Sequence, residues 1–133
     1  MGTLEFERDC FFLLFIGTPR SGHSIIGAIL DAHPNAIVSH ELHALQKISQ
    51  GWTGNQLLKG IFETSAKQAA KGRSQSQKDH GENYLQNATP TGMEYRFDYA
   101  IPTQYQGRVR GPIKVIGDKK GGGTTKILAD HPD

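Results

Sequence analysis

The sequence predicts an α/β fold, in which strands and helices follow one another along the chain. The first observation is an apolar run, residues 10–16, that leads through a glycine-bounded loop directly into a helical pattern. The second is that short apolar segments continue to alternate with helical ones along the chain. The helices between the strands are expected to cover the sheet. The chain of 133 residues, 36% of them hydrophobic, fits one domain with a modest core.

Each early element follows from a local pattern. Residues 10–16 are apolar throughout, which predicts a strand buried on both faces of the sheet. Glycines then break the strand, and residues 24–32 predict a helix. Its large apolar side chains share one stripe: Ile25, Ile26, Ile29 and Leu30. Residues 36–38 are short and apolar enough for a second strand, and helical composition returns at residues 42–50 and 55–70.

The second half of the chain is more polar. Residues 71–83 are rich in Lys, Ser, Gln and Gly, which predicts a solvated connection or a mobile loop. Residues 93–105 place aromatic side chains between polar ones, a pattern that fits an edge strand, a partly ordered wall of an acceptor site or ordinary half-buried aromatic residues. Residues 113–116 predict another short strand, and after three glycines residues 124–129 begin a helix.

Charge and cysteine content exclude several classes of protein. With 15 Lys and Arg against 13 Asp and Glu, the net charge of +2 indicates neither a nucleic-acid partner nor a membrane surface. The apolar run near the N-terminus is too short to span a bilayer and follows acidic residues, unlike a signal peptide. We therefore expect a cytoplasmic location, or the secretory pathway if an N-terminal anchor is missing from this chain. The single cysteine, Cys10, is predicted to be a buried thiol.

The glycine-bounded loop carries the main chemical signal. Gly17 and Gly22 have the G-x-x-x-x-G spacing of a phosphate-binding P-loop, but His23 stands where nucleotide phosphoryl transfer requires lysine. The loop has its cation at Arg20 instead, and a guanidinium can donate two parallel hydrogen bonds to a phosphate or sulfate group. Ser24 adds a hydroxyl donor at the helix start, where backbone N–H groups favour an anion. The pattern therefore predicts an anion site whose chemistry is not ATP hydrolysis.

The chain around this loop resembles the opening of the sulfotransferase family. The match runs from Phe-Ile-Gly-Thr-Pro-Arg-Ser-Gly-His-Ser at residues 15–24, through Leu-Asp-Ala-His-Pro at residues 30–34, to His-Glu-Leu at residues 40–42. It is most similar to the branch that includes tyrosylprotein sulfotransferases and many bacterial relatives. The resemblance implies a P-loop NTPase-like three-layer α/β/α fold, in which helices cover both faces of a mainly parallel sheet. It implies as donor 3′-phosphoadenosine-5′-phosphosulfate. It also implies in-line transfer of the sulfuryl group to a hydroxyl or amine acceptor, with no metal.

By this resemblance the loop holds the 5′-phosphosulfate of the donor. Its contact residues would be Pro19, Arg20, Ser21, Gly22, His23 and Ser24. His23 departs from the family's usual threonine, although an imidazole N–H can replace the hydroxyl contact. Glu41 matches the general base, which accepts the proton of the acceptor hydroxyl. His40 is a competing base, because imidazole titrates near neutral pH and other branches of the family use a histidine.

A second match, Gly-Asp-Lys at residues 117–119, resembles the family segment that brings a lysine to the transferring group. Lys119 would neutralise charge on the sulfuryl oxygens and on the bridging oxygen as the bond to phosphate breaks, and Lys120 is its possible substitute. The predicted catalytic residues are thus Arg20, Glu41 and Lys119.

One family feature is absent from the sequence. Members of the family bind the donor's 3′-phosphate through a later segment that usually begins with Arg-Asn-Pro or Arg-Asp-Pro, and neither run occurs here. Residues 1–133 are therefore expected to form the N-terminal part of a single sulfotransferase domain whose C-terminal half is absent. Two other hypotheses stay open: a degenerate P-loop kinase or NTPase, and an inactive remnant. The pattern does not indicate which acceptor is used.

Overall fold

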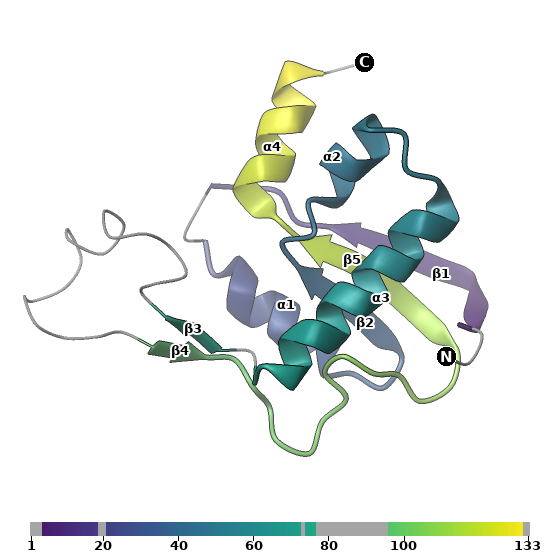
Figure 1. Ribbon diagram of the computed structural model, residues 1–133, viewed down its shortest axis with the longest axis vertical. Helices are drawn as coiled ribbons and strands as arrows, with labels where there is room; N and C mark the ends of the chain where they lie inside the picture. Colours follow the sequence, from purple (N-terminus) through teal and green to yellow (C-terminus); the bar gives the residue numbers. More distant parts are fainter. Residues whose placement is uncertain (1–3, 19–20, 73, 77–95, 132–133) are drawn as a thin grey trace, which may run out of the picture.

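Three parallel strands form the centre of the fold. The computed structural model describes residues 4–18, 21–72, 74–76 and 96–131 (Figure 1). The strands are β1 at Phe6–Leu14, β2 at Ala36–His40 and β5 at Ile113–Lys119, and the sheet order is β1-β5-β2. Both outer strands pair in parallel with β5, so the carboxyl ends of all three meet at one edge of the sheet. The expected α/β fold with a parallel sheet is confirmed.

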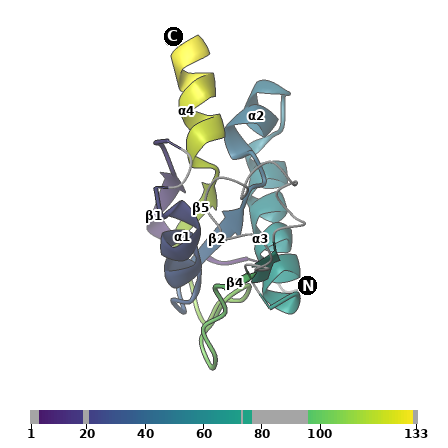
Figure 2. The same cartoon turned by 90° about the vertical axis from the view of Figure 1, so that its left-hand side faces the viewer.

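Helices flank the sheet on both faces. Their bounds are His23–Asp31 for α1, Ala44–Ser49 for α2, Gly54–Ala70 for α3 and Gly121–Asp130 for α4. α1 and α3 lie on opposite sides of the sheet (Figure 2). Neighbouring residues of β2 show the same division: Ile37 belongs to the core cluster with α3, whereas the Val38 side chain lies 3.7 Å from the Cβ position of Gly27 in α1. α2 and α4 lie at the end of the sheet where the strands terminate (Figure 1).

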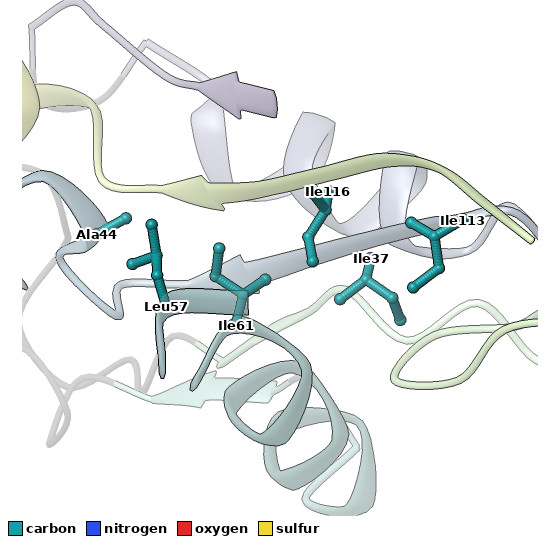
Figure 3. Packing of buried hydrophobic residues seen from close by; sticks show 6 residues of the cluster. All are labelled: Ile37, Ala44, Leu57, Ile61, Ile113 and Ile116. Carbon is teal, nitrogen blue, oxygen red and sulfur yellow. The ribbon is translucent and has the colours of Figure 1, made fainter. Parts of the chain in front are cut away.

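The main core lies between α3 and the sheet (Figure 3). Its buried members are Ile37, Ala44, Leu57, Ile61, Ile113 and Ile116. α3 begins with a capping box, in which Thr53 Oγ1 accepts a hydrogen bond from Gln56 N at 3.3 Å and Gln56 Oε1 accepts one from Thr53 N at 2.8 Å. Burial of the apolar face of α3 holds β2 and β5 together, and these two strands end at His40 and Lys119.

The prediction that the first strand is buried on both faces is wrong. In the described part of the chain β1 pairs only with β5, so it forms an edge of the sheet. Phe11 is 71% exposed and Phe12 43%, and Ile16 beyond the strand is 63% exposed. An apolar strand of this kind is typical of a position between two neighbours, and β1 has one neighbour among the described residues. Cys10, predicted to be buried, is half-buried, and this burial raises the pKa of its thiol.

The first helix does not contact the sheet through its apolar stripe. Ile25, Ile26 and Ile29 are 51%, 49% and 51% exposed. The buried positions of α1 are Gly27, Ala28 and Asp31. The physical reason is close approach: a Cβ atom at Gly27 would lie 3.2 Å from Cγ of Lys119 in β5, so α1 meets the sheet through small residues.

The later elements fall close to their expected positions. α2 and α3 confirm the two central helices. Both later strands extend beyond the expected apolar segments, to His40 and Lys119. The last helix begins at Gly121, inside the glycine run and not after it, because Thr124 N donates a hydrogen bond to Lys120 O at 2.8 Å and closes a first turn.

A second, two-stranded sheet lies in the polar half of the chain. Residues 74–76, expected in a solvated connection, form β3 (Ser74–Ser76), which pairs antiparallel with β4 (Arg96–Asp98). β4 shows that part of the aromatic segment is a strand, because its backbone finds partners in β3. Residues 77–95, which hold the rest of the expected connection, lie outside the described residues.

Candidate functional site

The carboxyl ends of β2 and β5 bring predicted site residues together. His40, the last residue of β2, lies opposite Lys119, the last residue of β5, in the parallel register. Glu41 follows directly, and its backbone N–H donates to Lys119 O at 2.9 Å. The loop after β1 starts at the same edge, since Leu14 is paired with Asp118. The fold thus joins Glu41 to a lysine 78 positions away in the sequence.

Glu41 lies at the centre of a cluster of basic side chains. Its Oε1 is 3.1 Å from Lys119 Nζ, and its Oε2 is 3.4 Å from Lys120 Nζ. His40 Nε2 lies 3.9 Å from Oε1. The side chain of Lys119 is only 7% exposed, whereas that of Glu41 is 36% exposed. The carboxylate therefore remains accessible from solvent while its main cation is enclosed by the protein.

Burial and charge act in opposite directions on this pair. Burial alone would raise the pKa of Glu41, but the charge and hydrogen bond of Lys119, followed by the charges of Lys120 and His40, outweigh burial and hold the pKa at about 2. Burial lowers the pKa of Lys119, and the charge of Glu41 opposes that effect. Glu41 is therefore an ionised carboxylate at neutral pH, in the state required to accept a proton.

The turn that carries Glu41 has an unusual backbone. Glu41 and His43 both have a φ of 64°, in the left-handed region that non-glycine residues rarely adopt. Asp118 is completely buried and accepts hydrogen bonds from Leu42 N at 3.0 Å and Ala44 N at 2.8 Å. Asp118 was not among the predicted site residues. The available signal was an acidic residue in an apolar strand, which needs partners when it is buried.

Only part of the predicted phosphate loop belongs to the described structure. Pro19 and Arg20, two of the predicted donor contacts, lie outside the described residues. Ser21 Oγ donates a hydrogen bond to Thr18 O at 2.8 Å. Gly22 has a φ of 77° and precedes α1 without a side-chain cap. The N–H groups of the first turn of α1 therefore point toward the loop, which is the orientation that an anion site at a helix start uses.

His23 joins the loop to the start of α4. Its ring packs edge-on against Phe15 at a centroid distance of 5.7 Å. A Cβ atom at Gly121 would overlap the imidazole, so the ring fits there because residue 121 is glycine. Thr125 Oγ1, one turn later, accepts a hydrogen bond from Gly17 N at 2.6 Å. Gly17 and His23, on either side of the loop, are thereby fixed against the helix that follows the two lysines.

The predicted site residues fall into two groups at one edge of the sheet. The first contains Glu41 with its lysines and His40, which make direct contacts. The second is residues 21–24, in which Ser24 lies half-buried in the first turn of α1. The described contacts of His23 with α4 connect this second group to the segment that carries Lys119.

Comparisons with known proteins identify no relative. No family model, no curated protein and no solved structure matches the chain. Within the described ranges, no group of three or more His, Cys, Asp or Glu side chains is placed to hold a metal ion. Nor does any described helix combine the length and apolar character needed to cross a membrane. The function must therefore be argued from the site residues themselves.

Proposed function

We propose that the chain carries the donor loop and the general base of a sulfotransferase, which moves a sulfuryl group from 3′-phosphoadenosine-5′-phosphosulfate to a hydroxyl or amine acceptor. The observation that carries the proposal is the 3.1 Å contact between Glu41 and Lys119, at the sheet edge where the loop after β1 begins. Site segments from three separate parts of the sequence lie at the carboxyl end of a parallel sheet. Ligands of open α/β sheets bind at this end of the strands.

The architecture supports a P-loop type of fold. A glycine loop separates β1 from α1, and helices lie on both faces of the parallel sheet (Figure 2). The helix start after such a loop offers unpaired N–H groups to an anion. We therefore assign the fold to the P-loop NTPase-like α/β/α class as part of the same proposal.

The proposed reaction needs a base, cations and positioning, without a covalent intermediate. The acceptor oxygen or nitrogen attacks sulfur, and its new bond to sulfur forms as the bond between sulfur and the bridging oxygen breaks. Adenosine 3′,5′-bisphosphate is the leaving group. Glu41 takes the proton of the acceptor, while Lys119 and Arg20 neutralise charge on the sulfuryl group and the bridging oxygen.

The Glu41–Lys119 contact also links base strength to donor binding. While Lys119 faces Glu41, the carboxylate has a pKa of about 2 and is a weak base. A bound sulfuryl group competes for the ammonium of Lys119, so Glu41 loses part of its stabilisation and its pKa rises toward the usual value. Glu41 would thus become a stronger base only when the donor is in place.

The kinase-like hypothesis has less support from the described residues. Magnesium-dependent phosphoryl transfer needs a carboxylate that can bind the ion beside the loop. Asp118 lies near the end of β5, next to β1, but it is completely buried. Its oxygens accept hydrogen bonds from Ser39 Oγ, Leu42 N and Ala44 N. This carboxylate is therefore already engaged with the protein.

The test is calorimetric titration of the purified chain with adenosine 3′,5′-bisphosphate, in parallel with ATP and magnesium. We expect the bisphosphate to bind, and Arg20→Ala to weaken binding roughly tenfold or more, because a hydrogen bond to a charged group is lost. Arg108→Ala is the matched control, since Arg108 is exposed and lies over the ring of Tyr105, in the segment before β5. Binding of ATP with magnesium instead would favour the kinase-like hypothesis. A folded chain that binds neither nucleotide would contradict the proposal.

A further inference from the structure

Asp118 is a completely buried acidic residue that the proposed reaction does not use directly. Its Oδ1 accepts hydrogen bonds from Ser39 Oγ at 2.7 Å and from Leu42 N at 3.0 Å, and its Oδ2 accepts one from Ala44 N at 2.8 Å. These donors span the end of β2 and the turn into α2. A single carboxylate on β5 thus binds three groups of one short segment.

That segment contains the two left-handed residues, Glu41 and His43. They alternate with Leu42 and Ala44, whose N–H groups bond to Asp118. A left-handed backbone is unfavourable for a residue with a Cβ atom and persists where the surroundings fix it. Both oxygens of the Asp118 side chain accept hydrogen bonds from this turn, so Asp118 can provide that fixing contact.

The direction of the Glu41 side chain depends on this backbone. Glu41 N donates to Lys119 O at 2.9 Å, and Glu41 Oε1 lies 3.1 Å from Lys119 Nζ. A return of Glu41 to the right-handed or extended region would redirect its Cα–Cβ bond and break this arrangement. We propose that Asp118 is a positioning residue, which holds the turn after β2 so that the carboxylate of Glu41 faces Lys119. The catalytic consequence rests on the proposed function, whereas the positioning itself does not.

Asp31 offers a matched control for a purely structural role. It is also completely buried and accepts hydrogen bonds from Val38 N at 2.6 Å, Ser65 Oγ at 2.8 Å and Gly107 N at 2.9 Å. These donors lie in the middle of β2, in α3 and in the segment before β5. Replacing either aspartate with asparagine changes a buried side chain that accepts several hydrogen bonds. Comparison of the two variants therefore separates a general loss of stability from a change in the position of the Glu41 carboxylate.

The experiment is an NMR titration of the Glu41 side-chain carboxyl carbon in the wild-type chain, in Asp118→Asn and in Asp31→Asn. In the wild type the pKa of Glu41 is about 2, because two lysines and His40 face its carboxylate, and these groups are unchanged in both variants. We expect the pKa to rise by about one unit or more in Asp118→Asn, since the carboxylate moves away from Lys119. In Asp31→Asn it should stay at the wild-type value.

Two outcomes overturn the proposal. The first is a wild-type pKa of Glu41 in folded Asp118→Asn. If that variant does not fold, amide hydrogen exchange of the wild-type chain is the second test. Protection of the Leu42 and Ala44 amides equal to that of the β2 amides supports the proposal. Rapid exchange at both amides is the second outcome that overturns it. Neither measurement involves a nucleotide. A chain that fails to bind adenosine 3′,5′-bisphosphate can still pass this test, so the two proposals fail separately.

Discussion

Replacing Glu41 with glutamine tests the energetics of the central ion pair. The substitution keeps the shape of the side chain but leaves the Lys119 ammonium, 7% exposed, without its hydrogen-bonded carboxylate. Removing one partner of a buried pair is destabilising, because the remaining charge stays desolvated. We therefore expect Glu41→Gln to unfold more easily than the wild type at neutral pH.

The size of the effect follows from the pKa of Glu41. The difference between its usual pKa of 4.5 and the value of about 2 in the fold corresponds to roughly 3 kcal/mol, at about 1.4 kcal/mol per pKa unit. Because the side chain is 36% exposed, solvent screening reduces this contribution to about 1–2 kcal/mol. The folded pKa lies below the unfolded one. The stabilisation is therefore complete above pH 4.5 and is lost as the pH falls toward 2.

The assay is urea unfolding followed by circular dichroism at a series of pH values. Glu41→Gln should be less stable than the wild type by about 1–2 kcal/mol near neutral pH, and the two should converge near pH 2. The double variant with Lys119→Met should recover part of the loss, because the unpaired charge is removed. Glu63→Gln is the surface control: its partner Lys59 is 3.8 Å away and 64% exposed, so a change below ~0.5 kcal/mol is expected.

A stability difference that stays constant from neutral pH to pH 2 would refute this reasoning. It would mean that glutamine acts through packing and not through the lost charge of Glu41. Equal stabilities at neutral pH would refute it as well, since the ion pair would then contribute nothing to folding.

Two further substitutions test one contact beside the candidate site and one helix cap. Gly121→Ala would place a methyl group against the imidazole of His23, so the free energy of unfolding should fall by about 1–3 kcal/mol. Adding His23→Ser should restore most of this loss. Strictly additive losses in the double variant would argue against the contact. Thr53→Ala removes the N-cap of α3 and its reciprocal hydrogen bond with Gln56. This change should lower the free energy of unfolding by about 1 kcal/mol, and Tm by roughly 4 °C in a thermal scan. An unchanged Tm would show that the capping box does not contribute to stability.

Local sequence patterns predicted the positions of the helices and strands more accurately than the burial of their side chains. The strands at β2 and β5 and the helices after them follow from short apolar runs and helical composition. The prediction failed for the surroundings of β1 and α1, where Phe11 is 71% exposed and Ile29 51%. Composition reports how well a side chain can be buried, but burial also needs a neighbour. The identity of that neighbour is a property of the whole fold and not of the local pattern.

The motif matches predicted which residues the fold brings together, whereas the roles of these residues stay predictions. The match at residues 40–42 and 117–119 named Glu41 and Lys119, which are 3.1 Å apart. Asp118 was not among the predicted residues. An acidic residue in an apolar strand indicates that it needs partners, but these partners lie in a turn with two left-handed non-glycine residues, which carry no sequence signal for a positive φ. The predicted contacts of Pro19 and Arg20 lie outside the described residues and stay predictions.

The two groups of proposed site residues follow strands that differ in burial. Glu41 and Lys119 follow β2 and β5, where Ile37 and Ile116 are 0% and 2% exposed. The loop follows β1, an edge strand in which Phe11 is largely exposed. Functional groups are held in place by the packing of the elements that carry them, so the strands before Glu41 and Lys119 are packed more completely than the strand before the loop. Weak binding of adenosine 3′,5′-bisphosphate beside an intact Glu41–Lys119 pair would accordingly identify the β1 side of the sheet as the limiting element.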